Sequence, residues 1–384
     1  MDYWILIEEH HLDNFIDTYN RFYIWLIMKL FEYIDEYVLK EMLANGLISS
    51  RKHPFAPLTI LTYTKECQGE RIWNEATEKC RGLIVDDDLN IVARPFKKFY
   101  NYEELIADGF PIAKYLDENM AFEAYEKLDG SLGILYWLGD TPMIATKGSF
   151  DSEQASHATR ILHERYMDAC MKLDRNKTYL FEIIYPEDLH VVSYSGIDDI
   201  FLIGVLDNED ENTEYDIESY SHLFKTTKKY LGVEDWESLR TQIDGTNREG
   251  FVIRFADGFR LKLKYEDYWT LHYLKAGFSE KNIYKALKTE DYTYINDAMK
   301  LFDEEHKLHY EKIMNKYKSL YRKVLKVAAS ELRDDFATRK EAAEYFKTCT
   351  YPGVMFCMYD CKRISASVWK YVDRLVKFTE DEQN

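Results

Sequence analysis

The chain has 384 residues, 46% of them hydrophobic, so it can bury a large core and we expect two domains. Its net charge of −18 argues against a protein that binds nucleic acid over its whole surface. No apolar run is long enough to span a membrane, and the acidic start of the chain is unlike a signal peptide. Six cysteines without a CxxC pair or zinc spacing indicate a reducing, intracellular compartment.

The predicted elements begin with a helix. Apolar residues recur at three- and four-residue spacing from Leu12 to about Leu43, which predicts one long amphipathic helix. From Leu58 to Lys264, short β-branched and aromatic runs between turn residues predict strands, interrupted by a helix from about Ser152 to Leu173. The predicted strands are Thr59–Thr64, Gly82–Val85, Ile91–Arg94, Phe122–Leu128, Leu132–Trp137, Met143–Lys147, Thr178–Ile184, Ile200–Val205, Gly250–Phe255 and Phe259–Lys264.

After Tyr265 the strand pattern ends, and successive helices are predicted, including Glu305–Leu332 and Arg339–Lys347. The expected fold is α+β, a core of antiparallel sheets with flanking helices followed by an all-helical C-terminal domain. We expect residues 1–50 to form a helical segment packed on the core, residues 51–270 the core domain, and residues 271–384 the helical domain.

The charges are unevenly distributed. Acidic residues crowd the stretch from Asp207 to Glu218, which we expect to lie on a solvated face. Basic residues instead gather beside the motifs described next, which is compatible with a cleft for a phosphate-bearing substrate. They are Arg81, Arg94, Lys97, Lys98, Lys127, Lys147, Arg254, Arg260, Lys262 and Lys264.

The most informative stretch is Lys127-Leu128-Asp129-Gly130-Ser131, which places a lysine at the end of a predicted strand and before an Asp-Gly turn. Such a lysine can attack a nucleotide phosphate and carry the nucleotide covalently. An Asp-Gly pair between two apolar runs is also an ordinary signal for a β-hairpin. The motif alone therefore does not decide between the two interpretations.

Six further segments are weak evidence singly, but their order and spacing along the chain are informative. Together with Lys127–Ser131 they resemble the T-even-phage tRNA-repair RNA ligase family, within the covalent lysine nucleotidyltransferase superfamily. The resemblance extends over about Thr62 to Tyr268 and implies a nucleotidyltransferase core. The segments are Cys80–Ile84, Arg94–Asn101, Lys147–Ser149, Phe181–Ile184, Glu249–Val252 and Lys262–Lys264.

The resemblance implies a role for each matching residue. Lys127 would be the catalytic lysine that takes AMP from ATP, and Lys147 would bind substrate phosphate. Glu182 and Glu249 would hold Mg²⁺ or Mn²⁺, since oxygen ligands suit a hard cation. The nucleotide contacts implied are Tyr63, Arg81, Lys98, Tyr100, Glu182, Lys262 and Lys264. Each of these residues could instead be a surface residue or a structural ion-pair partner.

Elementary chemistry supports the lysine cluster. A lysine has an ordinary pKa of about 10.4 and is a poor nucleophile while protonated. Lys262 and Lys264 lie two apart on a predicted strand and point to one face, where they could contact phosphates. We expect these two cations to lower the pKa of Lys127 and so free its amine for attack.

The sequence therefore favours an ATP-dependent RNA ligase that joins 3′-hydroxyl and 5′-phosphate ends, tRNA being one candidate substrate. A ligase of DNA or RNA–DNA nicks and a non-catalytic nucleotide- or RNA-binding relative remain alternatives. One departure concerns Leu189-His190, since relatives carry an Asn-Arg pair after the Phe-Glu strand. We expect a monomer without membrane or protein partner, in the cytoplasm (that of a host cell if the chain is viral).

Overall fold

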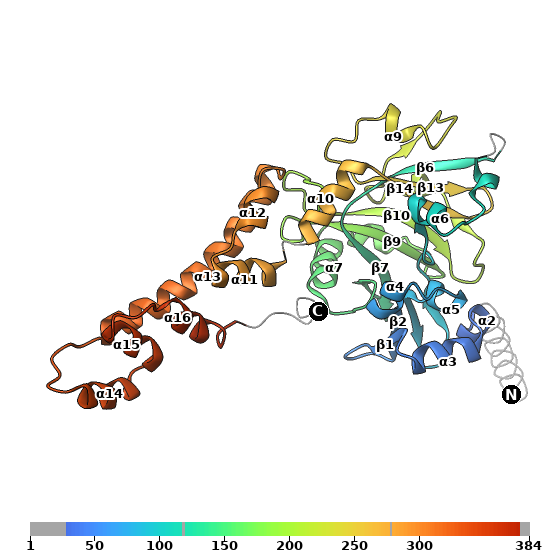
Figure 1. Ribbon diagram of the computed structural model, residues 1–384. Coiled ribbons are helices and arrows are strands. Elements are labelled where there is room, and N and C mark those ends of the chain that lie inside the picture. The colour runs from blue at the N-terminus through green and yellow to red at the C-terminus, as the bar shows by residue number, and fades with distance from the viewer. Residues whose placement is uncertain (1–27, 117–119, 277–278, 377–384) are drawn as a thin grey trace, which may run out of the picture. The chain divides into compact units, whose positions relative to one another are not determined.

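A computed structural model describes residues 28–116, 120–276 and 279–376. The chain divides into two compact units, Met1–Tyr265 and Glu266–Asn384, which are considered separately below (Figure 1). The first unit is an α+β assembly built on three sheets, and the described part of the second is helical. This architecture confirms the predicted fold class.

The first sheet is antiparallel and follows chain order, with helices covering one of its faces (Figure 1). Apolar side chains of α2, α3 and α5 pack there against Leu61 and Leu83 of the central strands. The strands are β1 (Ile48–Lys52), β2 (Leu58–Tyr63), β3 (Arg81–Asp86) and β4 (Ile91–Ala93). The helices of this region are α2 (Leu30–Tyr33), α3 (Glu36–Ala44), α4 (Lys65–Glu70) and α5 (Glu75–Lys79).

The second sheet has the order β11-β10-β9-β7-β8, and α7 packs against it through Ile161 and Leu162. Its other face shares a core with the first sheet, where Ile60 and Ile84 join Ile134 and Leu180. The strands are β7 (Ser131–Leu138), β8 (Thr141–Ala145), β9 (Lys177–Ile184), β10 (Asp199–Asp207) and β11 (Glu214–Tyr215), and the helices are α7 (Glu153–Arg165) and α8 (Met167–Cys170).

The third sheet has the order β12-β6-β13-β14-β5, and β5 is its one parallel strand among the described residues. Its strands are β5 (Tyr100–Asn101), β6 (Phe122–Lys127), β12 (Lys229–Tyr230), β13 (Gly250–Phe255) and β14 (Arg260–Lys264). Short helical elements complete the unit: α6 (Tyr102–Ala107), η1 (Ile112–Tyr115), η2 (Ile217–Tyr220) and α9 (Leu239–Gln242).

The predicted N-terminal helix is wrong where it can be compared. Residues 12–27 lie outside the described part of the chain. Beyond them the helix is interrupted at Ile34, which is extended, and restarts after Asp35. The Asp35 carboxylate accepts hydrogen bonds from the backbone N–H groups of Tyr37 and Val38, which is how an N-cap residue begins a new helix. The predicted helix from Ser152 to Leu173 is likewise broken, at Tyr166 between α7 and α8.

The Asp-Gly turn after Lys127 is no hairpin. Strand β6 before the turn belongs to the third sheet, whereas β7 after it belongs to the second. The three residues from Leu128 to Gly130 therefore carry the chain from one sheet to another. The hairpin interpretation of this motif is wrong, and the turn instead places Lys127 where two sheets meet.

The described part of the second unit consists of helices around one apolar core. The long helix α13 contributes Tyr310, Tyr317, Val324 and Ala328 to this core. The helices are α10 (Glu266–Ala276), α11 (Glu280–Thr289), α12 (Thr293–Ala298), α13 (Glu304–Glu331), α14 (Arg339–Thr348), α15 (Pro352–Tyr359) and α16 (Ser365–Val372). Among the described residues of either unit, no helix combines the length and apolar character needed to cross a bilayer.

Candidate active site

Three lysines and a glutamate meet on one face of the third sheet. In the strand register, Gly250 of β13 stands between Lys127 of β6 and Lys264 of β14. Lys262 lies two residues before Lys264 and points to the same face. Nζ of Lys127 is 2.7 Å from Oε2 of Glu249, and Nζ of Lys264 is 2.8 Å from Oε1. The Glu249 carboxylate, 3% exposed, is thus held between two ammonium groups.

Two glycines allow the backbone segments around the site to approach each other closely. A Cβ on Gly130 would lie 2.3 Å from the carbonyl oxygen of Ile183, and one on Gly250 would lie 2.1 Å from that of Leu263. Gly250 also has a φ of +146°, a conformation that other residues rarely adopt. Because Gly130 is so close to β9, its backbone N–H donates a 2.9 Å hydrogen bond to Oε1 of Glu182. The turn that carries Lys127 is therefore fixed against the second sheet.

The electrostatics of Lys127 differ from the sequence-based expectation. Burial acts to lower the pKa of Lys127, but the carboxylates of Glu249 and Glu182 outweigh burial, and the pKa is raised. The expectation that Lys262 and Lys264 lower it is wrong for this arrangement, because the lysine is ion-paired to Glu249. Burial, followed by the charges of Lys127 and Arg81, instead lowers the pKa of Lys262 well below the usual lysine value.

The carboxylate of Glu182 is shielded from solvent, which disfavours its charged form. Burial raises the pKa of Glu182 to about 7, with the charge of Glu249 adding to the rise and that of Lys127 opposing it. Burying a charged carboxylate costs folding free energy. Carboxylates with such raised pKa values are more common at functional sites than elsewhere.

Asp129 ties a loop to the lysine turn, a role that sequence reasoning missed. Its Oδ2 accepts hydrogen bonds of 2.7 and 2.8 Å from the backbone N–H groups of Val191 and Val192. Its own backbone N–H donates to the hydroxyl of Tyr194 at 2.7 Å. Nothing in the local sequence marks Tyr194 among the 31 tyrosines of the chain. The loop after β9 therefore covers the turn that follows Lys127.

The departure at Leu189-His190 lies in this same loop. Asp188 accepts a 2.7 Å hydrogen bond from the Ser131 hydroxyl and a 3.2 Å hydrogen bond from the side-chain amide of Gln154. Nε2 of His190 is 3.4 Å from the same carboxylate. The segment that replaces the Asn-Arg pair of relatives is thus fastened to the lysine motif through Asp188.

A cavity of about 330 Å³ opens beside these groups, a size suited to a nucleotide. Its lining includes Lys127, Glu182, Lys262, Arg81 and Phe99. The Phe99 ring centroid is 4.8 Å from Nζ of Lys262 and 5.7 Å from Cζ of Arg81. Nη1 of Arg81 is buried without a hydrogen-bond partner among the described residues. An oxygen of a bound phosphate or sugar would satisfy it, because buried polar groups are normally hydrogen-bonded.

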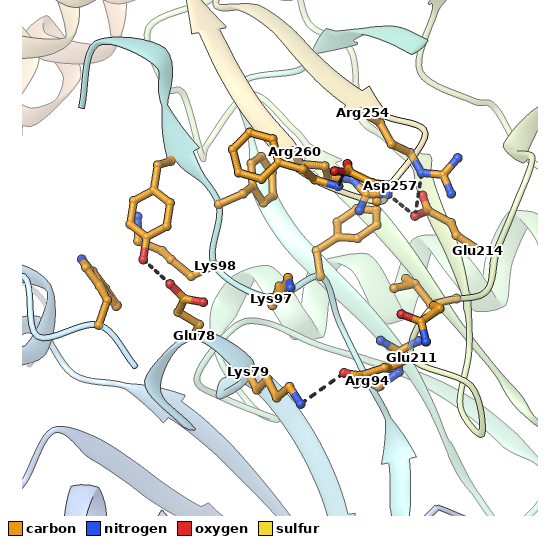
Figure 2. A pocket seen from close by; sticks show the side chains of 18 of the residues that line it. Glu78, Lys79, Arg94, Lys97, Lys98, Glu211, Glu214, Arg254, Asp257 and Arg260 are labelled. Atoms are coloured by element: carbon orange, nitrogen blue, oxygen red, sulfur yellow. Dashed lines mark hydrogen bonds and ion pairs between the residues drawn. The ribbon is translucent and has the colours of Figure 1, made fainter. Parts of the chain in front are cut away.

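A second, larger pocket of about 870 Å³ adjoins the first and shares Phe99, Arg254 and Arg260 with it. Figure 2 shows the Glu214 carboxylate directed at the guanidinium groups of Arg254 and Arg260, with which it forms ion pairs. Glu214 is only 14% exposed, so its predicted place on a solvated acidic face is wrong. The two arginines are partly neutralised and form less of a basic cleft than the sequence suggests.

Lys98 and Tyr100 line this larger pocket (Figure 2). Nζ of Lys98 is 4.4 Å from the ring centroid of Tyr100 and 4.8 Å from that of Trp73. Burial lowers the pKa of Lys98, and the Tyr100 hydroxyl donates a hydrogen bond to Glu78. The lysine therefore occupies an aromatic slot with access to the pocket.

The structure brings Tyr63 and Lys147 together, although they are predicted for different roles. Nζ of Lys147 is 4.3 Å from the Tyr63 ring centroid. Burial acts to raise the pKa of Tyr63, but the charges of Lys147, Arg81 and Lys98 together outweigh burial and lower it. The two residues therefore belong to the same positively charged region as Arg81 and Lys98.

The carboxylates fit a divalent cation only in part. Both oxygens of Glu249 already accept from lysines, and one oxygen of Glu182 accepts from Gly130. Among the described residues there is no group of three or more His, Cys, Asp or Glu side chains that could hold a metal ion. A Mg²⁺ or Mn²⁺ ion at Glu182 and Glu249 would therefore need further oxygen ligands from a nucleotide or water.

Comparison with known proteins gives the site its context. A protein-family model described as RNA ligase, of the T4 RNA ligase 1 type, matches residues 79–270. A protein of Autographa californica nuclear polyhedrosis virus, named as a bifunctional polynucleotide kinase/RNA ligase, is 25% identical over 213 residues. That match covers 50% of this chain and 30% of the viral protein.

Similar solved structures include a Naegleria gruberi RNA ligase variant with ATP and Mn, which is 20% identical with a TM-score of 0.34. The match covers 46% of this chain and 56% of that one. An archaeal ATP-dependent RNA ligase is 14% identical with a TM-score of 0.43, over 81% of this chain and 85% of that one. The chain thus spans little more than half of the Naegleria ligase and less than a third of the viral protein. Since the family match takes in half of its residues, including the lysine turn and both carboxylates, the chain belongs to the RNA ligase family.

Proposed function

We propose that the chain is an ATP-dependent RNA ligase that joins a 3′-hydroxyl to a 5′-phosphate through lysyl-AMP and RNA-adenylate intermediates. Residues 51–270 would form its adenylyltransferase domain. The observation that carries the proposal is the placement of Lys127 at a junction of two sheets, between two carboxylates and beside Lys262 and Lys264. Membership of the RNA ligase family supports the same chemistry.

In the first step the neutral amine of Lys127 attacks the α-phosphate of ATP. An N–P bond forms, the bond to the β-phosphate oxygen breaks, and pyrophosphate leaves with the electron pair. Charge accumulates on the phosphate oxygens, and we assign its stabilisation to Lys262, Lys264 and Arg81. The buried, unpaired nitrogen of Arg81 is one donor for these oxygens.

Lys127 must lose a proton before it attacks, yet Glu249 raises its pKa. The ion pair therefore describes a resting state from which the lysine has to be released. Glu182 and Glu249 would hold a divalent cation, whose positive charge next to Lys127 would favour the neutral amine. Lys264 remains as the second partner of Glu249 once Lys127 has reacted.

In the following steps AMP passes from Lys127 to the 5′-phosphate of an RNA, and a 3′-hydroxyl displaces AMP to form the phosphodiester. Lys147, beside Tyr63 and near Lys98, is the proposed contact for the RNA phosphate. We propose that the protein acts as a monomer and that tRNA is among its substrates.

Incubation with α-labelled ATP and Mg²⁺ or Mn²⁺ tests the first step. The wild type should acquire a covalent label that survives denaturation, and Lys127→Ala should acquire none. A matched control is Lys172→Ala, an exposed lysine outside the site, which should be labelled like the wild type. Absence of label on the wild type would remove the ligase proposal and leave the nucleotide- or RNA-binding alternative.

The nucleic acid is tested separately. Single-stranded RNA with 5′-phosphate and 3′-hydroxyl ends, a cleaved tRNA stem-loop, and nicked DNA and RNA–DNA duplexes are offered to the labelled protein. The proposal requires AMP transfer to RNA and sealing of RNA ends. Preferential sealing of the nicked duplexes would favour the alternative function of a DNA or hybrid ligase.

A further inference from the structure

The long helix α13 carries a basic stripe on the side opposite its core residues. From Lys312 to Ser330 the helix contains six lysines or arginines and no acidic residue. The stripe consists of Lys312, Lys316, Lys318, Arg322, Lys323 and Lys326. At 1.5 Å of rise per residue, it extends for about 21 Å along the helix. The buried residues Tyr310, Tyr317 and Val324 recur at seven-residue spacing on the other side.

Most of the stripe lacks neutralising partners. Lys316 forms an ion pair of 2.6 Å with Glu280 of α11. No acidic partner among the described residues accompanies Lys312, Arg322, Lys323 or Lys326, all of which are exposed, or the half-exposed Lys318. The first turn of the same helix is different, because there Lys307 is paired with Glu304 at 2.7 Å.

The spacing of the stripe makes it self-repulsive. Lys318, Arg322 and Lys326 stand four residues apart, so each faces the next on the helix surface. Like charges at this spacing destabilise a helix, and a surface that serves only solubility mixes the two signs. An uninterrupted row of cations therefore indicates a polyanionic partner that compensates the repulsion.

The distribution of charge over the chain singles out the same unit. Glu266–Asn384 contains 21 basic and 20 acidic residues, although the whole chain has a net charge of −18. All of the excess negative charge is consequently in Met1–Tyr265, which has 29 basic and 48 acidic residues. A polyanion that approaches this protein is repelled by most of its surface and attracted to the stripe on α13.

We propose that the α13 stripe binds the phosphate backbone of RNA without regard to base sequence. The inference rests on the proposed ligase function, because the RNA bound here is the body of the molecule whose ends are joined. Lysine and arginine side chains on one helix face recognise phosphates rather than bases, so the stripe contributes affinity and not sequence specificity.

The test uses the full chain and a 5′-phosphorylated RNA with a 3′-deoxy end, which can bind but cannot be sealed. Binding is measured by fluorescence anisotropy across a series of salt concentrations. The stripe variant replaces Lys318, Arg322 and Lys326 with Gln. Its control carries Lys285→Gln, Lys340→Gln and Lys370→Gln, three exposed lysines on α11, α14 and α16 that remove the same charge from the same unit.

The stripe variant should bind a single strand about tenfold more weakly at low salt, and its log K against log salt slope should fall by about 2. The control should change neither quantity by as much. A base-paired hairpin of the same length as the single strand should also lose affinity, since its phosphates are equally available.

Three results would overturn the inference. The two triple variants could lose affinity equally, which would reduce the effect to net charge. RNA binding could be unchanged in the stripe variant. Binding to vesicles of phosphatidylcholine and phosphatidylserine could depend on the stripe while binding to RNA does not. That result would assign the surface to a membrane. Covalent labelling with ATP shows that the first unit of both variants is folded, and an unchanged helical circular-dichroism signal shows the same for the second unit. A wild type without label refutes the ligase proposal instead.

Discussion

Replacing Glu182 with Gln should stabilise the protein at pH 8 and at the same time impair its reaction with ATP. The carboxylate of Glu182 is buried near Glu249, which raises its pKa to about 7 from an ordinary value of 4.5. Gln keeps an oxygen that can accept the 2.9 Å hydrogen bond from Gly130 but carries no charge. The variant therefore loses the charge that the folded protein tolerates poorly and retains the contact that positions the lysine turn.

The sign and size follow from linkage. Because the folded-state pKa of Glu182 is raised, the folded protein holds a proton that the unfolded chain has lost between pH 4.5 and about 7. Wild-type stability due to this group therefore falls as the pH rises through that window. At about 1.4 kcal/mol per pKa unit the full effect is about 3 kcal/mol. The pKa of about 7 already includes the opposing attraction to Lys127. Because burying the polar amide of Gln also costs free energy, we expect a gain of about 1–3 kcal/mol for Glu182→Gln at pH 8.

Calorimetric unfolding at pH 8 and at pH 4.5 measures the difference between wild type and Glu182→Gln. At pH 8 the variant should melt about 2–10 °C higher. At pH 4.5 the difference should largely vanish, since wild-type Glu182 is then protonated. Covalent labelling with ATP should fall at least about tenfold. A variant that is no more stable at pH 8, or one whose advantage persists at pH 4.5, would refute the reasoning.

Three further substitutions probe the site. Gly130→Ala should cost about 1–3 kcal/mol and slow labelling strongly, because its Cβ would collide with the backbone oxygen of Ile183. Gly69→Ala, with open space around it, is the control and should stay within about 1 kcal/mol of wild type, both measured by urea unfolding. Asp129→Ala leaves two backbone N–H groups without an acceptor and should cost about 2–4 kcal/mol by the same measurement, whereas a change below about 0.5 kcal/mol would contradict that role. Lys262→Met should lower the rate of labelling with ATP without lowering the melting temperature, since it removes a buried amine whose pKa is depressed; a labelling rate like that of wild type would contradict a role in the reaction.

Periodicity predicted most of the fold. All ten predicted strands exist within a few residues of the expected limits, and α13 begins and ends one residue before its prediction. These elements bury one face or both, so the apolar pattern reports them directly. Strand β1 was missed because Ser49, Ser50, Arg51 and Lys52 are exposed and show no alternation. Strands of two residues such as β12 are too short to leave a pattern.

The arrangement of the site was harder to predict. The candidate residues Lys127, Glu182, Glu249, Lys262 and Lys264 were proposed because the segments that carry them resemble, in order and spacing, those of the RNA ligase family. Their protonation could not be predicted, since it depends on which charges become neighbours after folding. Sequence spacing places two lysines on one strand but cannot show that a carboxylate separates them from a third. The raised pKa of Lys127 arises from the carboxylates that folding brings beside it, first Glu249 and then Glu182.

Contacts between distant segments escaped prediction for the same reason. The loop after β9 reaches the lysine turn through Asp129 and Tyr194, which are 65 residues apart. Glu214, expected in solvent, is half-buried because it pairs with Arg254 and Arg260, which come from a hairpin far along the chain. Such pairings depend on tertiary structure, which no local pattern encodes.

The crossing from β6 to β7 gives the lysine turn a mechanical role. Its three residues connect a strand of the third sheet to a strand of the second, and the hydrogen bonds that the Glu182 and Asp129 carboxylates accept restrict its movement. A change in the separation of the two sheets would therefore pull on Lys127 directly instead of being absorbed by a flexible loop. In the proposed ligase, filling the cavity between the sheets would in this way move the Lys127 amine, so that substrate binding and the alignment of the proposed nucleophile would become one motion.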